Sequence, residues 1–245
     1  MLKNTDETVS DSSENSIPNF DSLPRNIVAR NLPEHVQQVL LEAILSRMLV
    51  PGQRLLIDKL AEHFGISKIP VREAVKALET AGWLESQPRR GTYVRPLSQD
   101  ELFEVFEMRR VLEPYAARLA AQRRTEAQLV QLQEAITAGK AAVKVRDLVE
   151  MSRINSQFHS VIADAVGNSI LADSLKDLQS RIRRYYSDVN WAARRKSVAE
   201  HQQIYEAIRN RDADRAEALT INHVGHIWTL AQEELVKQGL GTNNH

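Results

Sequence analysis

The stretch from Phe64 to Glu79 constrains the fold of this chain more than any other part of the sequence. Its apolar side chains recur at steps of three, one and three residues, the spacing of one helical face: Val71, Ala74, Val75 and Leu78. Three basic side chains lie four residues apart on another face: Lys68, Arg72 and Lys76. The pattern therefore predicts a helix with one apolar face and one basic face.

The start of this helix has features that favour an anion. Ser67 is placed to cap the helix, and Pro70 falls in the first turn, where its missing N–H group matters least. Free backbone N–H groups and the positive end of the helix dipole then lie near the amine of Lys68. This combination favours binding of a phosphate group.

Two further helices are predicted before this one. The first begins at Asn31 and ends at Pro51-Gly52, and the second runs from about Asp58 to Phe64. Gly65 supplies the tight turn that follows. Three helices in this order, with the last two short and closely joined, form a helix-turn-helix layout.

A β-hairpin is predicted after the third helix. Two short β-prone runs, 83–86 and 92–95, flank a Pro/Gly turn that carries Arg89 and Arg90. No acidic residue occurs between Ser86 and Leu97. A basic hairpin tip after a helix-turn-helix is a wing suited to the phosphate backbone or the minor groove of DNA.

Composition limits the remaining possibilities. The chain has 245 residues, enough for two domains, and no cysteine, so it has no disulfide, thiolate zinc site or thiol nucleophile. Lys and Arg total 32, and so do Asp and Glu. This balance argues against a protein that coats DNA, but a sequence-specific reader needs basic residues only at its contact surface.

The first residues are expected to carry no fold. Residues 1–30 are rich in Asn, Ser, Asp, Glu and Thr, which predicts a disordered leader. No apolar run is long enough to span a bilayer, and no signal sequence is apparent at the N-terminus. We therefore expect a cytoplasmic protein with no membrane partner.

The second half of the chain has an almost uninterrupted helical pattern. We place a DNA-binding domain at 31–96 and an all-helical domain at 97–240. No strand pattern and no fixed repeat is found in the second half, so the predicted fold is mainly α, with a winged helix-turn-helix joined to an antiparallel helical bundle. Pro114 is expected to kink or split the first bundle helix, which leaves a choice between six and seven helices.

Capping residues mark several of these helices. Ser98 and Glu101 form a capping-box start for the first, Thr125 begins the second, and the third extends from about Asp147 to Val166. Ser197 is expected to cap the fifth, and the last is expected to start near Ala213.

Histidine is the second informative residue type. His159, His201 and His223 each fall on the apolar face of a different predicted bundle helix, so their imidazoles can converge. Two interpretations stay open from spacing alone: ordinary hydrogen-bonded core histidines, or a site for a divalent metal ion such as zinc or nickel. His226, one turn beyond His223, is a competing but less favoured ligand.

The sequence from Leu55 to Val94 resembles the winged helix-turn-helix of the GntR family of bacterial transcription regulators. The resemblance is carried by LAxxFGISxxPVREAVxxL at residues 60–78, GWL at 82–84 and GTYV at 91–94. The helical half resembles the FCD effector-binding domain of the FadR-type branch. There the matching positions are Arg109-x-x-Leu112-Glu113, Phe158-His159, Glu200-His201 and the late His223.

This resemblance implies a homodimer that binds a short palindromic operator in double-stranded DNA. By the family pattern Lys68 and Arg72 reach the major groove, and Arg89, Arg90 and Gly91 belong to the wing. Ser67 and Ile69 complete the expected contact surface. Arginine is commoner in the family at position 68, and lysine lacks its planar fork, so a guanine contact there is geometrically less strict.

The resemblance also implies a small-molecule effector bound in the bundle. FadR-type domains often carry a three-histidine metal site with an acidic residue four positions before the first histidine, and here that position is Asn155. The implied ligands are therefore Asn155, His159, His201 and His223. A metal with open positions would ligate a carboxylate effector, and Arg109 matches the family arginine that faces this pocket. A surface salt bridge with Glu107 or Glu113 is the alternative role for Arg109.

The leading hypothesis is thus a ligand-responsive transcription regulator, most simply a repressor. One alternative is a metal-dependent hydrolase, although no general base of the His-Glu-x-x-His kind is present. Another is a constitutive DNA-binding protein whose bundle only dimerises. The run from Arg181 to Tyr186 is basic and aromatic, and we interpret most of it as a solvated helix face.

Overall fold

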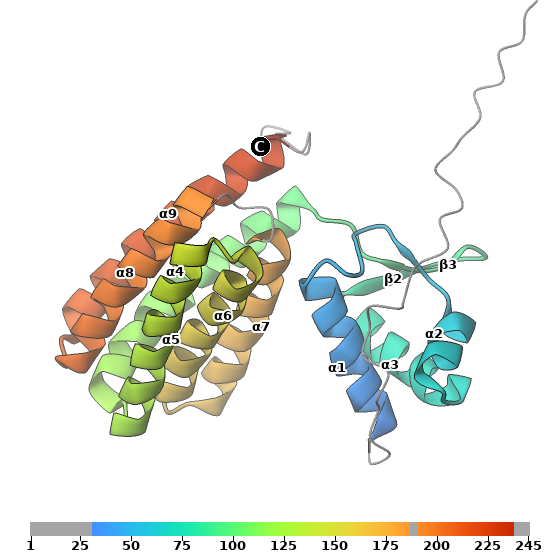
Figure 1. Ribbon diagram of the computed structural model, residues 1–245, viewed down its shortest axis with the longest axis horizontal. Coiled ribbons are helices and arrows are strands. Elements are labelled where there is room, and N and C mark those ends of the chain that lie inside the picture. The colour runs from blue at the N-terminus through green and yellow to red at the C-terminus, as the bar shows by residue number, and fades with distance from the viewer. Residues whose placement is uncertain (1–30, 187–190, 238–245) are drawn as a thin grey trace, which may run out of the picture. The chain divides into compact units, whose positions relative to one another are not determined.

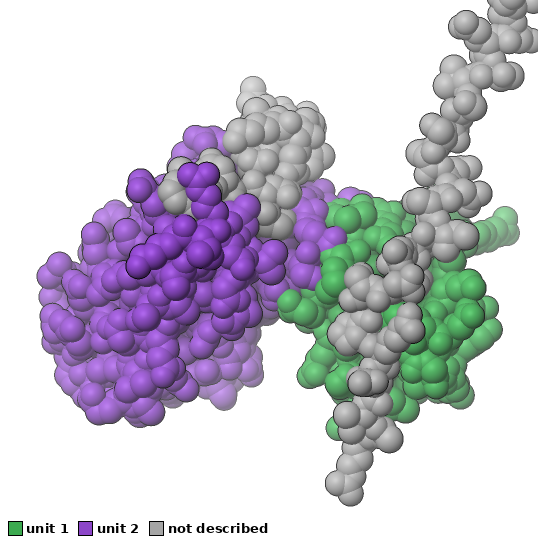
Figure 2. Space-filling view, in the orientation of Figure 1, with its two compact units in different colours: residues 1–43, 48–95 green, residues 44–47, 96–245 purple. Residues whose placement is uncertain are grey.

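A computed structural model describes residues 31–186 and 191–237, without the side chains of 186, 191–193 and 234–237. The chain divides into two compact units, one of residues 1–43 and 48–95 and the other of residues 44–47 and 96–245 (Figure 2). The predicted disordered leader at 1–30 lies outside the described residues.

The first unit contains three helices and a small antiparallel sheet (Figure 1). The elements are α1 (Leu32–Leu45), β1 (Arg54–Leu55), α2 (Ile57–Phe64), α3 (Lys68–Thr80), β2 (Leu84–Gln87) and β3 (Gly91–Val94). The strand order is β1-β3-β2. The predicted hairpin is confirmed by the pairing of Gln87 with Gly91. Strand β1 was not predicted, because two residues are too short to show an alternating pattern.

Helix α1 ends earlier than the sequence suggested. It stops at Leu45, and Arg47 then adopts a left-handed conformation with φ 64°. Such a residue commonly ends a helix, because it turns the chain away from the helix axis. The prediction that α1 continues to Pro51-Gly52 was therefore wrong by about one turn.

Helices α2 and α3 pack through the predicted apolar residues. Leu60, Val71 and Leu78 are fully buried. Gly65 joins the two helices with a φ of +65°, a conformation that side chains other than glycine adopt only with strain. Ser67 takes the N-cap position of α3, but its side chain makes no capping hydrogen bond.

The second unit is a bundle of helices, as predicted. In the described part of the chain it has six: α4 (Gln99–Arg123), α5 (Glu126–Val145), α6 (Leu148–Ala165), α7 (Ser169–Tyr186), α8 (Trp191–Arg209) and α9 (Ala213–Lys237). Among the described residues, no helix is both long and apolar enough to cross a bilayer.

Two predictions about helix boundaries in the bundle need correction. Pro114 lies inside α4, which runs through it as one element, so the helix is not split. Buried residues on both sides of Pro114, such as Phe106 and Ala120, anchor both halves of α4 in the bundle. Ser197 does not cap α8, because that helix already begins at Trp191 and Ser197 is buried within it.

The predicted caps at Thr125 and Ser98 are present, although Ser98 and Glu101 form only half of the expected capping box, and Asp147 also caps α6. Thr125 forms a complete capping box with Gln128 at the start of α5. The side chains of Ser98 and Asp147 accept hydrogen bonds from the backbone N–H groups of Glu101 and Glu150. These contacts satisfy N–H groups that have no partner within the helix.

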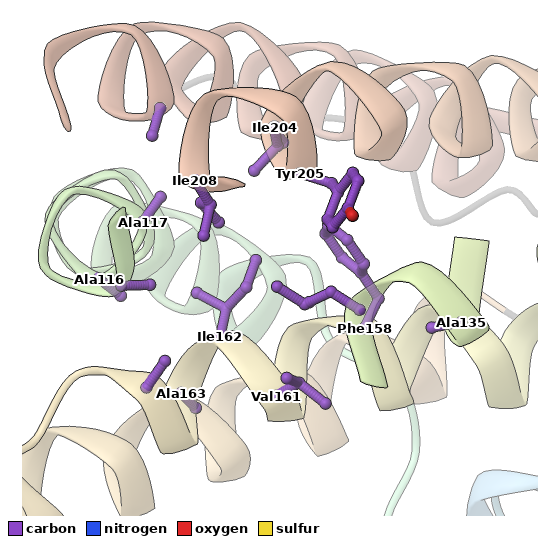
Figure 3. Packing of buried hydrophobic residues seen from close by; sticks show 14 of the residues in the cluster. Ala116, Ala117, Ala135, Phe158, Val161, Ile162, Ala163, Ile204, Tyr205 and Ile208 are labelled. Atoms are coloured by element: carbon purple, nitrogen blue, oxygen red, sulfur yellow. The ribbon is translucent and has the colours of Figure 1, made fainter. Parts of the chain in front are cut away.

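The bundle has one apolar cluster mainly between α4, α5, α6 and α8 and another between α4, α7 and α9. Phe158 and Ile162 of α6 point toward Ile204 and Ile208 of α8, with the small Ala117 of α4 beside them (Figure 3). This apolar packing fixes the helix faces that carry His159 and His201, because His159 directly follows Phe158 and His201 lies about one turn before Ile204.

Candidate functional site

The N-terminal part of α3 exposes every residue predicted to contact DNA there. Ser67, Lys68, Ile69 and Arg72 are all exposed, and the side chain of Ile69 is 67% accessible. Lys68 Nζ lies 2.9 Å from Asp58 Oδ1 of α2. In the described part of the chain, Arg72 makes no ion pair, so its guanidinium is available to an external partner.

The tip of the β2–β3 hairpin is also exposed and basic. Arg89 has a left-handed backbone, with φ 64°, and Arg90 and Gly91 follow it at the surface. Gly91 has a φ of +115°, and a Cβ atom there would approach the Arg54 Nε atom to 3.0 Å. The close approach brings Arg54, which the sequence did not indicate, beside the tip of the wing.

Side-chain hydrogen bonds connect this wing to α3. Glu79 of α3 accepts hydrogen bonds from the hydroxyls of Ser86 on β2 and Thr92 on β3, the latter at 3.2 Å. Ser86 and Thr92 also contact each other at 3.2 Å. These hydrogen bonds connect the wing to α3, and both basic surfaces belong to the same compact unit.

Three histidines meet in the interior of the bundle. His159 of α6, His201 of α8 and His223 of α9 are all buried, and one ring nitrogen of each lies within 4.8 Å of the others. The Nε2 atoms of His201 and His223 are 3.4 Å apart. The structure thus brings together the three histidines that the sequence placed on separate helices.

Their surroundings keep two of these imidazoles neutral. Burial lowers the pKa of His159 and of His201 well below the ordinary value for histidine, and the neighbouring His223 lowers both further. The ring of Phe158 stacks on His201 with centroids 4.2 Å apart. Neutral imidazoles retain a free nitrogen lone pair, the form that ligates metal ions.

Glu200 of α8 supports this cluster from one side. Its Oε2 atom lies 2.8 Å from His223 Nδ1, and Glu200 also contacts His226 Nδ1 at 3.2 Å. Burial works to raise the pKa of Glu200, but the interactions with His223 and His226 leave that pKa below its ordinary value. A carboxylate on Nδ1 leaves Nε2 of His223 directed at the cluster. His226 is outside the group of three.

Arg109 and Glu113 of α4 form a buried pair on the other side. Their side chains are 2% and 5% exposed, so the alternative of a surface salt bridge is wrong for Arg109. Glu113 also accepts a hydrogen bond of 2.8 Å from Gln179 of α7, and its Oε2 atom is 3.7 Å from His159 Nδ1. Arg109 Nη1 and His159 Nε2 are buried without a hydrogen-bond partner.

Two hollows adjoin the histidines. One has about 370 Å³ of empty space, counting the part open to solvent, and is lined by Asn155, Phe158, Arg194 and His201 among others. The second, of about 320 Å³ on the same measure, is lined by Glu113, His159 and Gln179 among others. Asn155 is half-buried and borders the same hollow as His201.

The basic run at the end of α7 is less solvated than we expected. Arg184 and Tyr185 are buried. The hydroxyl of Tyr185 donates to Glu101 Oε2 at 2.8 Å, and Arg184 donates to the carbonyl oxygen of Pro96 at 3.0 Å. This network holds the start of α4 against α7.

Sequence reasoning missed the acidic and amide residues that support the histidines. Glu200 was noted only as part of a family match, Glu113 also as a possible surface partner of Arg109, and Gln179 was not noted at all. The signal available for Glu113 was its position four residues after Arg109, which places both on one helical face. No local pattern indicated Gln179, because its partner is on another helix.

The exposed basic helix, the wing and the buried polar cluster define a class: a DNA-binding regulator with a separate ligand-binding bundle. Residues 32–94 match the family described as "Bacterial regulatory proteins, gntR family", and residues 104–226 match the "FCD domain". The chain belongs to the GntR family of transcription regulators, in the branch with an FCD domain. Its relatives are regulators of transcription, not enzymes.

Individual relatives agree with this assignment. The chain is 29% identical over 174 residues to the Nta operon transcriptional regulator of Aminobacter aminovorans, covering 71% of this chain and 82% of that one. It is 25% identical over 196 residues to the transcriptional repressor RspR of Escherichia coli K12, covering 79% and 86%. The solved structure of E. coli McbR/YncC aligns with a TM-score of 0.73 and 25% identity, covering 85% of this chain and 98% of that one.

Proposed function

We propose that this protein is a homodimeric repressor whose affinity for a palindromic operator changes when a small organic acid binds beside a metal ion in the bundle. The observation that carries the proposal is the convergence of three buried histidines next to a buried arginine. The protein acts on double-stranded DNA, so we place it in the cytoplasm. Its similarity to RspR, a named repressor, favours repression.

The DNA contacts follow from exposure and charge. Lys68 and Arg72 reach base edges in the major groove, and the free N–H groups at the start of α3, beside Ser67 and Ile69, bind phosphate. Arg89, Arg90 and Gly91 place the wing on the backbone or in the minor groove. One short helix covers too few bases for an operator, so two copies read the two half-sites.

The residues of the cluster fit a divalent metal ion. In a tetrahedral zinc site with bonds of about 2.0–2.1 Å, two ligand nitrogens lie about 3.3–3.4 Å apart. The 3.4 Å separation of the His201 and His223 Nε2 atoms agrees with this spacing. His159 Nε2, buried and without a partner, supplies the third ligand. Zinc and nickel are the ions that three imidazoles favour.

The fourth position differs from the usual acidic ligand. Asn155 brings an amide oxygen without negative charge, so the ion keeps more of its own positive charge than it would beside a carboxylate. When bound, the metal supplies a Lewis-acidic position for an anionic effector. Asn155 is the protein ligand proposed for this position, with water as the alternative.

Arg109 is the proposed partner of the effector carboxylate. Its Nε and Nη2 atoms are engaged by Glu113, whereas Nη1 is buried without a hydrogen-bond partner. An unsatisfied buried donor is costly, and an acidic ligand would satisfy it with a charge-assisted hydrogen bond. A carboxylate held between Arg109 and the metal would then perturb the packing of α4.

Two measurements test the proposal. Selection from random DNA duplexes should yield a palindromic consensus, and binding without sequence preference would contradict the assigned class. Thermal unfolding with zinc, with chelator and with a panel of carboxylic acids should show a higher melting temperature with zinc and a further rise with one acid. No shift with any compound would favour the constitutive DNA-binding dimer instead.

A further inference from the structure

We propose that two copies of this chain associate through the outer face of α4 and α9, centred on Val111 and Ile221. The inference extends the proposed function, which requires a dimer but does not say which surface forms it. Four large apolar side chains on this face are at least half exposed: Met108 at 50%, Val111 at 68%, Tyr115 at 50% and Ile221 at 54%.

These four side chains form one surface, because α4 and α9 are antiparallel neighbours (Figure 1). Arg118 of α4 pairs with Asp214 at the start of α9, and Phe106 contacts Trp228 further along it at 4.9 Å between ring centroids. Val111 lies seven residues before Arg118, and Ile221 lies seven residues after Asp214. In an antiparallel pair these two positions are level with each other, two turns from the salt bridge.

The four residues of this face lie on two neighbouring helices. The other large exposed apolar residues described in this unit are Phe103 on α4, Val130 and Val145 on α5, Leu148 and Val149 on α6, and Ile170 on α7. Single exposed residues of this kind are normal on a monomer surface. A group of four on two adjacent helices is instead typical of a protein–protein interface.

The charges beside this face indicate that the partner is a second copy. Glu104, Glu107 and Arg110 are exposed on α4, and none has an ion pair or side-chain hydrogen bond in the part of the chain that the structure describes. Glu104 and Glu107 come before Met108 in the sequence. Arg110 follows Glu107 by three positions and directly precedes Val111. If two α4 helices cross antiparallel about a twofold axis level with Met108 and Arg109, Glu107 of each copy faces Arg110 of the other, and Val111 lies within one turn of the axis.

That arrangement is self-complementary, as a twofold interface requires. In such an interface each residue pair occurs twice, so one acid and one base on the same helix are sufficient. A twofold axis through α4 also matches the twofold symmetry of a palindromic operator. The two unpaired glutamates would repel the phosphate groups of DNA, so DNA is not the expected partner at this face.

Sedimentation velocity on the full chain tests the surface. The wild type should sediment as a dimer of twice 27.8 kDa, and Val111→Arg should raise the dimer dissociation constant at least tenfold. Val130→Arg is the matched control, since it adds the same charge at an exposed valine of α5 and should leave the dimer intact. Far-UV circular dichroism spectra should be unchanged in both variants, because both positions are exposed and neither substitution alters the folded helices.

Charge exchange gives a sharper test of the twofold pairing. Glu107→Arg and Arg110→Glu should each weaken the dimer, because each places like charges opposite one another. The double variant Glu107→Arg/Arg110→Glu should recover the wild-type dissociation constant, because the exchanged pairs are complementary again. Equal weakening in the double variant would overturn the antiparallel pairing.

The outcomes separate this inference from the proposed function. A Val111→Arg variant that dimerises as tightly as the wild type would overturn the α4–α9 surface, even if operator selection succeeds. A wild type that stays monomeric at every concentration would also overturn it. Failure to select any DNA sequence would instead contradict the proposed function and would not affect the sedimentation result.

Discussion

The exposed basic surface of α3, where we propose that DNA binds, and the histidine cluster of the bundle are opposite kinds of site. The first consists of exposed charges on neighbouring residues, such as Lys68 and Arg72. The second consists of buried groups contributed by α4, α6, α7, α8 and α9. At an exposed site each charge is solvated and acts largely by itself, whereas at a buried site each polar group left without a partner costs stability.

This difference predicts how the two sites respond to mutation. Loss of one surface charge removes one contact and leaves the rest in place. Loss of one buried group leaves a neighbouring polar group unpaired in a medium of low polarity. The loss of stability is therefore larger, and it destabilises the fold as well as the site. The predictions below test this contrast, beginning with the largest expected effect.

Removal of two imidazoles should abolish metal binding. The double variant His159→Ala/His201→Ala should fall from about one zinc per chain to none in elemental analysis, because one remaining histidine cannot hold the ion. The control is His35→Ala/His63→Ala, which removes two histidines outside the cluster and should keep the metal. Equal metal content in the two double variants would show that the ion binds elsewhere.

Breaking the buried ion pair should destabilise the bundle strongly. Arg109→Met leaves Glu113 buried beside Gln179 without its cation and should reduce the free energy of unfolding by about 3–5 kcal/mol. Arg153→Met breaks an exposed pair with Glu150 and should cost less than about 1 kcal/mol. Chemical denaturation of both variants measures the contrast, and similar losses would contradict it.

The supporting carboxylate should matter less than a ligand. Glu200→Gln keeps the shape of the side chain but removes the charge that orients His223, so metal affinity should fall about 10–100-fold. Glu206→Gln, a similar change one and a half turns further along α8, is the control. Isothermal titration with zinc compares them, and an unchanged affinity in Glu200→Gln would refute its supporting role.

At the DNA surface, single substitutions should have moderate effects without loss of fold. Arg72→Ala should weaken operator binding by about 1–3 kcal/mol and relax specificity at one base position. Lys76→Ala removes a charge one turn further along the helix and should weaken operator and random DNA alike, since we expect no base contact there. Fluorescence anisotropy on both DNAs distinguishes the two, and unchanged operator binding by Arg72→Ala would refute its assigned role.

The same contrast explains which features the sequence could predict. The helix-turn-helix, the wing and the helical bundle depend on local spacing and turn residues, and these predictions were confirmed. The three histidines could be found because each lies on an apolar helical face. The pairing of Glu113 with Gln179, and the contact of Tyr185 with Glu101, depend on how separate helices pack, so no local pattern shows them.

Errors in the prediction have similar causes. Pro114 was expected to kink or split α4, and the split was wrong, because packing of the residues on both sides holds the helix together. Ser197 has a good capping side chain, yet the helix extends past it toward Trp191 and buries it. In both cases tertiary contacts override a local preference.

A crystal structure of the zinc-loaded protein, with anomalous data on both sides of the zinc edge, tests the central claim most directly. The account predicts one anomalous peak per chain in the bundle, about 2.0–2.1 Å from the Nε2 atoms of His201 and His223 and bonded also to His159. A peak bound by other residues, or an ordered histidine cluster with no peak, would contradict it.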